Sequence, residues 1–478
     1  MQVLFVYLLE DVVYSCARTF AGVQFWSFTW HSRIVMSSPR NVRKERLASV
    51  NEDEGDAALE DNPTRPLIPA DCSAPPYSHL AWLCFYLLGI GTLLPWYFLI
   101  TAKGYWDKKF NGEDNEHGKL AVYFESYISI ASTAPNVLFS ILGVVLVNKL
   151  SANWRVHASL FVIALLLAVT VVLVKVDTTK WRTVFFTITL LFTVVISGSS
   201  MVFMGTIFGL AGQLPSGYSQ AVISGQAMGG TLSALLSILD LAVADDITNS
   251  ALVYFVMATA YTIFCMFLYS MLCRLPIARY YFVPDGSETN PVPVRNSLPP
   301  IRMILHHTRC LGFCVFYCFL ISISLFPAVL SNIEPTSSRS KGSWLNKYFA
   351  PVCIFLLYNV ADLVGRTVAG WVQWPSPHSH LLLALTLLRT VFIPLTLICH
   401  FDPRSHLTAN LLSSDIFPIL ISSTLGLSNG YLGSLALAYG PKAVPPELTE
   451  ATGVALMVFL ACGLAAGSLF SVLLVYLI

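Results

Sequence analysis

From residue 79 onward, long apolar windows alternate with short polar breaks. Windows long enough to cross about 30 Å of hydrocarbon fall at 79–101, 123–148, 157–176, 183–211, 218–244, 250–273, 308–330, 348–372, 379–400, 412–438 and 449–477. Only helices and closed barrels satisfy their backbone hydrogen bonds in lipid. The pattern therefore predicts an all-α polytopic membrane protein with eleven transmembrane helices.

The longest polar interruption within this region covers residues 275–305 and is rich in Pro, Gly and Ser. Such a composition is typical of a flexible linker. It divides the spans into six and five, which predicts an N-terminal six-helix bundle at 78–274, a cytosolic linker, and a C-terminal five-helix bundle at 306–478. This 6+5 arrangement suits a transporter whose two bundles rock around a midplane site.

The first 77 residues are predicted to form a disordered cytosolic tail, because residues 37–77 are polar and charge-rich. Residues 1–36 are apolar but contain no run of spanning length and no basic region typical of a signal peptide. We interpret them as an atypical leader or an extended gene model, with an amphipathic interfacial segment as the alternative.

Composition narrows the class of protein further. Apolar residues make up 55% of the chain and charged residues 12%, with a mean hydropathy of +0.66. A net charge of +1 gives no electrostatic basis for binding nucleic acid. The chain has no P-loop, no GxSxG or HExxH motif and no Cys/His cluster of metal-binding spacing. We therefore expect no enzyme activity, no cofactor and no metal.

Small and polar residues interrupt the apolar sequence between Ile196 and Ser237. Small residues allow helix backbones to approach closely, and amides buried in hydrocarbon require partners. The stretch predicts two tightly packed helices that line a polar cavity, with a turn at 215–217. Such a cavity is typical of transport.

Three polar residues of the eighth span, Asn359, Asp362 and Arg366, are spaced to share one helix face. Asp362 and Arg366 are four residues apart and so can neutralise each other in the membrane. One interpretation is a structural ion pair; the other is that the pair also binds hydroxyl groups of a substrate. Arg389 in the ninth span has no sequence-local acid and is expected to serve packing or a cytosolic network.

The first span contains Pro95 followed by Trp96. Proline bends a helix, and the flat indole either packs against neighbours or stacks on a planar heterocycle. Kinks are also expected at Pro135 and at Phe326–Pro327.

Three acids lie near span ends. Glu447 and Glu450 lie at the start of the last span. They are expected to stabilise the N-terminal end of that helix by capping it and by compensating the helix dipole. Asp240, deeper among apolar residues, is a candidate pH sensor. We also keep Glu450 as a pH-sensing candidate.

Motifs in every part of the membrane region resemble the equilibrative nucleoside transporters, a solute carrier family. They are G-T-L-L-P-W (91–96), F-G-L-A-G-Q-L-P (208–215), I-S-G-Q (223–226), R-L-P-I-A-R-Y-Y (274–281), Y-N-V-A-D-L-V-G-R (358–366), L-S-N-G-Y-L (427–432) and Y-G-P-K (439–442). Other segments, such as Y-F-E-S-Y (123–127), are most similar to the lysosomal member.

This resemblance implies a major-facilitator-like fold with a cytosolic N-terminus and a lumenal C-terminus. It implies facilitated diffusion of nucleosides such as adenosine and uridine, with nucleobases as further substrates and with flux favoured at acidic pH. The substrate-binding positions that it implies are Trp96, Thr133, Asn136, Met204, Gly225, Phe326, Phe355, Asn359, Asp362, Arg366 and Leu464. Thr133, Asn136 and Met204 differ from the plasma-membrane members, which places base preference in question.

The resemblance also predicts a monomer in the lipid bilayer of late endosomes or lysosomes, with the plasma or mitochondrial membrane as alternatives. A nearby alternative function is the monoamine-preferring branch of the same family. That branch would need extra acidic residues to hold a cation, and none accompanies Asp362. A non-transporting membrane receptor is a third alternative, which the six-plus-five arrangement disfavours.

Overall fold

The computed structural model describes residues 75–101, 103–110, 118–243, 247–282, 299–333, 348–377, 379–399, 401, 412 and 414–477. The membrane helices belong to one compact unit, Leu80–Ile478. The predicted leader and almost all of the predicted tail lie outside the described residues.

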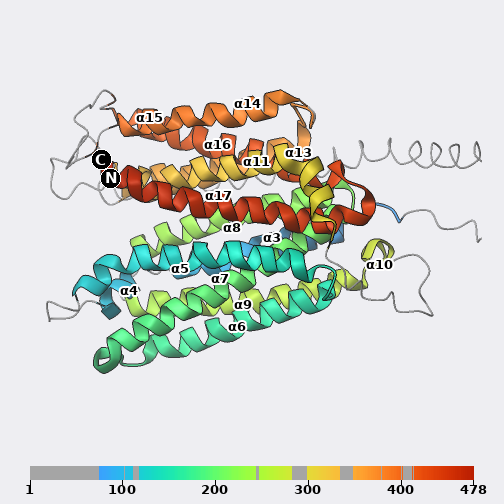
Figure 1. Cartoon of the computed structure of the whole chain (residues 1–478). Coiled ribbons are helices and arrows are strands. Elements are labelled where there is room, and N and C mark those ends of the chain that lie inside the picture. The colour runs from blue at the N-terminus through green and yellow to red at the C-terminus, as the bar shows by residue number, and fades with distance from the viewer. Residues whose placement is uncertain are drawn as a thin grey trace, which may run out of the picture. The chain divides into compact units, whose positions relative to one another are not determined.

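The first half of this unit consists of helices joined by short connections (Figure 1). They are α3 (His79–Thr101), α4 (Lys103–Phe110), α5 (Gly118–Leu146), α6 (Ala152–Lys175), η2 (Thr179–Trp181), α7 (Arg182–Gln213), α8 (Ser216–Val243), α9 (Ile247–Arg274) and α10 (Pro276–Phe282).

The second half is helical as well, and includes a π-helical segment, η4, that runs directly into α13. Its elements are α11 (Ile301–Leu325), η3 (Leu330–Asn332), η4 (Phe349–Leu356), α13 (Leu357–Trp371), α14 (His380–Leu388), η5 (Arg389–Val391), α15 (Phe392–Leu397), α16 (Ile416–Tyr439), η6 (Gly440–Ala443), η7 (Pro446–Leu448) and α17 (Thr449–Leu477).

The predicted all-α class is confirmed for the described residues, whose only extended pairings are two isolated bridges. Nine helices in these ranges are long and apolar enough to cross a membrane. They coincide with nine of the predicted spans. Helices α5 and α16 occupy the other two, but α5 meets the apolar criterion only over Ile130–Leu146, and α16 is not among the nine. The count of eleven stays a prediction.

Both ends of the predicted linker 275–305 are helical. Pro276–Phe282 forms α10, and α11 begins at Ile301, seven residues before the predicted span. The extra turns of α11 are amphipathic: Ile304 is buried while His306 and His307 are exposed. An apolar window misses such turns because only one face of the helix is apolar.

The ninth span is broken into α14, a 3₁₀ turn and α15. Pro394 explains the break, because its ring clashes with the carbonyl four residues earlier and it offers no N–H to the helix. Arg389 begins the 3₁₀ turn. The side chain of Arg389 therefore projects from the break between α14 and α15.

Glycines bring several pairs of helices into backbone contact, among them α8 with α3 and α13 with α16. A Cβ at Gly225 of α8 would overlap the carbonyl of Tyr86 on α3. A Cβ at Gly430 of α16 would overlap the carbonyl of Asp362 on α13, and Gly365 and Gly426 make similarly close backbone contacts between the same two helices. Small residues are what such helix pairs need in a membrane.

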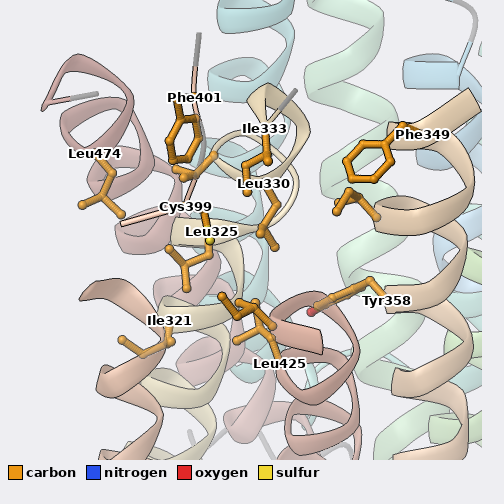
Figure 2. Packing of buried hydrophobic residues seen from close by; sticks show 13 residues of the cluster. Ile321, Leu325, Leu330, Ile333, Phe349, Tyr358, Cys399, Phe401, Leu425 and Leu474 are labelled. Carbon is orange, nitrogen blue, oxygen red and sulfur yellow. The ribbon is translucent and has the colours of Figure 1, made fainter. Parts of the chain in front are cut away.

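A cluster of buried apolar side chains fills one end of the second half (Figure 2). It joins α11, η3, η4, α13, α16 and α17 through Ile321, Leu325, Leu330, Phe349, Tyr358, Leu425 and Leu474. Tyr358 lies at the edge of this cluster, one turn of α13 before Asp362. The apolar core therefore ends where the polar residues of α13 begin.

Candidate functional site

Asp362 is buried on α13 and both of its carboxylate oxygens accept hydrogen bonds. Arg366 Nε donates to Oδ2 over 2.7 Å, forming the predicted i, i+4 ion pair. The amide of Asn429 on α16 donates to Oδ1 over 2.6 Å. The three residues are 5%, 7% and 4% exposed. Ionised groups at this depth require such partners, and here the carboxylate is held from two sides.

The hydrogen bonds continue from Asn429 into α11 and the ninth span. Ser322 Oγ donates to Asn429 Oδ1 over 2.7 Å. Arg389 Nη2 in turn donates to Ser322 Oγ over 2.7 Å. A buried polar chain therefore runs from Arg366 through Asp362, Asn429 and Ser322 to Arg389, and it joins four helical segments.

Arg366 also contacts the first half of the chain. Its Nη1 donates to the carbonyl of Ile223 on α8 over 3.3 Å. The side chain of Gln220 on α8 donates to the carbonyl of Arg366. The polar face of α13 therefore lies against α8, as expected for a site between two halves of a transporter.

Asn359 lies on the same buried face of α13, one turn before Asp362. Its Nδ2 donates to the carbonyl of Phe355 over 2.8 Å, which leaves the amide oxygen directed elsewhere. Gly230 of α8 lies next to that oxygen and next to the phenol of Tyr97 on α3.

Aromatic rings flank this polar face. Phe326 stacks on Tyr358 with ring centroids 3.8 Å apart and planes at 8°. Phe355 meets Phe326 edge to face at 5.2 Å. The structure therefore brings the predicted residues Phe326 and Phe355 together, with Tyr358 as an additional member.

The remaining predicted positions are distributed over five helices, α3, α5, α7, α8 and α17. Trp96 is half-buried on α3, with its ring 5.5 Å from that of Tyr97. Thr133 and Asn136 are half-buried on α5, on either side of Pro135.

The remaining apolar positions, Met204 and Leu464, and the glycine Gly225 are not members of the hydrogen-bonded chain. Met204 is buried on α7, and Leu464 is half-buried on α17, which packs against α7. Gly225 lies at the backbone contact of α8 with α3. Its position indicates helix packing as its role.

The two pH-sensing candidates lie at opposite ends of the helices. Glu450, in the first turn of α17, forms an ion pair with the buried Arg155 of α6 and accepts from Gln213 of α7 over 3.0 Å. Asp240, near the end of α8, accepts from Ser250 of α9. The predicted capping role of Glu450 therefore accompanies a contact between the two halves of the chain.

Sequence reasoning did not place Tyr97, Gln220, Ser322, Arg389 or Asn429 in the site. Each is a polar residue within an apolar span, which is a general signal for function. Their partners, however, are more than 30 residues distant in sequence, so helical spacing gave no sign of them. No group of three or more His, Cys, Asp or Glu residues placed to hold a metal ion occurs in the described ranges.

The fold is that of the major facilitator transporters. A human organic anion transporter superposes with a TM-score of 0.51 at 16% identity, over 84% of this chain and 95% of its own. The fucose:proton symporter of Escherichia coli gives 0.50 at 14% identity, over 83% and 97%. At this level of identity the likeness concerns the fold alone.

Sequence comparison identifies the family. The model described as "Nucleoside transporter" matches residues 190–290 and 285–476. Equilibrative nucleoside transporter 3 of Rattus norvegicus is 43% identical over 83% of this chain and 89% of its own length. Equilibrative nucleoside transporter 1 of Homo sapiens is 33% identical over 82% and 96%. With its polar site on the eighth span and its match over most of the membrane region, this multi-pass chain belongs to the equilibrative nucleoside transporter family.

Proposed function

We propose that this protein carries nucleosides, among them adenosine and uridine, down their concentration gradient across the late endosomal or lysosomal membrane. Equilibrative nucleoside transporters are carriers and not enzymes, and facilitative transport follows from membership of the family. The substrate, the acidic optimum, the membrane and the site residues are the parts that we propose. Nucleobases are a further substrate class in this proposal.

The buried Asp362–Arg366 pair against α8 is the observation that carries the proposal. A carboxylate accepts hydrogen bonds from ribose hydroxyls, and a guanidinium donates to their oxygens. Asn359 adds an amide on the same helix face. A neutral solute with several hydroxyls is the ligand that such a set of groups fits.

The base is expected to lie against aromatic rings. Trp96 on α3 and Phe355 on η4 belong to different halves of the chain, and the proposal places the planar base between their rings. Thr133, Asn136, Met204, Phe326 and Leu464 complete the proposed lining. Stacking is tolerant of base identity because every base has a flat face.

The monoamine alternative is disfavoured by the charges of the site. The buried polar chain contains two arginines, Arg366 and Arg389, and a single acid, Asp362. A cationic substrate would meet a net positive charge in a region of low dielectric constant. A neutral nucleoside avoids this repulsion.

We further propose that residues 78–274 and 306–478 move as two bundles in a monomeric carrier. The contacts that would break and re-form are Arg366 with Ile223, Gln220 with Arg366, and Arg155 with Glu450. The sequence identity to equilibrative nucleoside transporter 3 is higher than the identity to equilibrative nucleoside transporter 1. Together with the resemblance to the lysosomal member of the family, this supports an acidic compartment.

Radiolabelled adenosine and uridine flux in proteoliposomes, with internal and external pH varied separately, tests this function. Saturable flux without an ion gradient that increases at acidic pH is expected. Flux that is equal at all pH values would refute the acidic preference, and the absence of flux with either solute would refute nucleoside transport.

A further inference from the structure

Arg389 is a buried cation that forms no ion pair with an acid among the described residues. Its side chain is 2% exposed. It donates to the carbonyl of Cys318 over 2.9 Å, to Ser322 Oγ over 2.7 Å and to the carbonyl of Leu425 over 3.4 Å. Its Nη1 also lies against the sulfur of Cys318, and its Nε has no hydrogen-bond partner in the described chain. Burying a guanidinium that is hydrogen-bonded only to neutral groups costs desolvation free energy that no ion pair offsets.

The chain that leads away from Arg389 has a fixed direction. An arginine donates and never accepts, so Ser322 Oγ must accept from it. The single hydroxyl hydrogen of Ser322 then goes to Asn429 Oδ1. The amide of Asn429 is thereby oriented with its NH₂ group toward Asp362 Oδ1.

The same chain holds both carboxylate oxygens of Asp362. Asn429 donates to Oδ1 and Arg366 donates to Oδ2, so both oxygens act as acceptors. Because the two donors come from α16 and α13, the carboxylate is held from two sides.

We propose that Arg389 is a positioning residue of the nucleoside site. Through Ser322 and Asn429 it holds the Asp362 carboxylate in one orientation. The remaining lone pairs of the carboxylate are then directed at the substrate hydroxyls. This inference rests on the proposed function, since it assigns Arg389 a part in the binding that Asp362 performs.

Ser322→Ala tests the proposal with a small change. It cuts the chain between Arg389 and Asn429 without removing a charge. Ser324→Ala is the matched control, because Ser324 is also buried on α11 and donates to the carbonyl of Leu320 in its own helix. Uridine uptake by the full-length protein in proteoliposomes gives KM and Vmax, and thermal unfolding in detergent gives Tm.

We expect Ser322→Ala to raise KM for uridine about fivefold, the factor that corresponds to one buried hydrogen bond. Ser324→Ala is expected to leave KM within about twofold of the wild type. In an Asn429→Ala background, Ser322→Ala is expected to change KM no further, because the chain is already cut. Arg389→Lys keeps the charge but loses the planar fork, and its KM is expected to rise at least as much.

The outcomes separate this proposal from the function on which it rests. Equal KM values for Ser322→Ala and Ser324→Ala, or effects of Ser322→Ala and Asn429→Ala that multiply, would overturn the positioning role. A lower Tm with unchanged KM would make Arg389 a structural residue only. Wild-type protein that carries neither uridine nor adenosine would instead refute the proposed function. Because Ser322→Ala retains Arg389, the test stands even where Arg389→Lys fails to fold.

Discussion

The phenol oxygen of Tyr97 and the amide oxygen of Asn359 come from opposite halves of the chain and approach the same point above Gly230. A Cβ built on Gly230 would overlap Asn359 Oδ1 and lie 2.9 Å from Tyr97 Oη. The bare backbone of α8 thus leaves room for two polar groups beside Asp362. This contact joins α3, α8 and α13 at one place.

Gly230→Ala is therefore expected to displace Asn359 and Tyr97. Overpacking of a close contact costs about 1–3 kcal/mol, and we expect a lower Tm together with about tenfold weaker uridine binding. Gly205→Ala is the control, since a Cβ there would meet Met457 and Val454 at an ordinary 3.7 Å. This control should gain up to about 1 kcal/mol from helix propensity. Equal uptake by the two variants would show that the space above Gly230 is not needed.

The phenol of Tyr97 is expected to contribute to substrate binding, because it lies beside the Asn359 amide above Gly230. Tyr97→Phe should raise KM for uridine by about three- to tenfold, the effect of one polar contact. Tyr86→Phe removes a phenol from the same helix whose oxygen has no hydrogen-bond partner in the described chain. Uptake kinetics of both variants decide the matter, and an unchanged KM in Tyr97→Phe would exclude its hydroxyl from the site.

Asp362→Asn is expected to reduce uptake to near background while the protein is still expressed. The change leaves Arg366 buried without its anion, which costs about 3–5 kcal/mol when one partner of a buried pair is removed. The exchange Asp362→Asn with Asn429→Asp returns a carboxylate to the cluster from α16. We expect the exchange to recover Tm but not uptake, because the carboxylate no longer projects from the face of α13. Recovery of uptake would remove the carboxylate of Asp362 from the substrate contacts.

The pH dependence of flux is expected to depend on Asp240 more than on Glu450. With the N-terminus in the cytosol, as the resemblance predicts, α8 would begin at the cytosolic side and Asp240, near its end, would lie on the lumenal side. Asp240→Asn should make flux at lumenal pH 5 equal to flux at pH 7, within about twofold, because an amide does not titrate. A wild-type pH profile in this variant would leave Asp240 with a structural role.

Glu450→Gln gives the contrasting case. Glu450 pairs with Arg155 at the predicted cytosolic end, and the loss of this pair should change flux by a similar factor at every lumenal pH. Initial rates of uptake are measured at several lumenal pH values with the outer pH held constant. They distinguish a uniform change in flux from a flattened dependence of flux on lumenal pH. A flattened profile in Glu450→Gln would reverse the assignment of the two acids.

Local sequence patterns were sufficient for the helices and for the ion pair on α13. Apolar windows located the spans to within a few residues, except where amphipathic turns extended α11 to Ile301. The spacing of Asp362 and Arg366 predicted their contact because both residues lie on one helix. The structure shows this contact at 2.7 Å.

Contacts between helices were not accessible in the same way. Arg389 was expected to serve packing or a cytosolic network because no acid lies near it in sequence, yet Ser322 and Asn429 connect it to Asp362. The partners of such groups are set by which helices are neighbours. Helical periodicity carries no information on that point, so the network became visible only in three dimensions.

The glycine contacts of α13 with α16 restrict how this carrier changes shape. At Gly365, Gly426 and Gly430 the two backbones touch with no side chain between them, and Asn429 links them to Asp362. Sliding α13 along α16 would bring carbonyl oxygens into steric overlap with Cα atoms. The two helices are therefore expected to move together as one rigid unit. The movement is then expected at the interface between α8 and α13, where side chains can exchange hydrogen-bond partners. We therefore expect Asp362 and Asn429 to keep their hydrogen bond during transport while the contacts between α8 and α13 change.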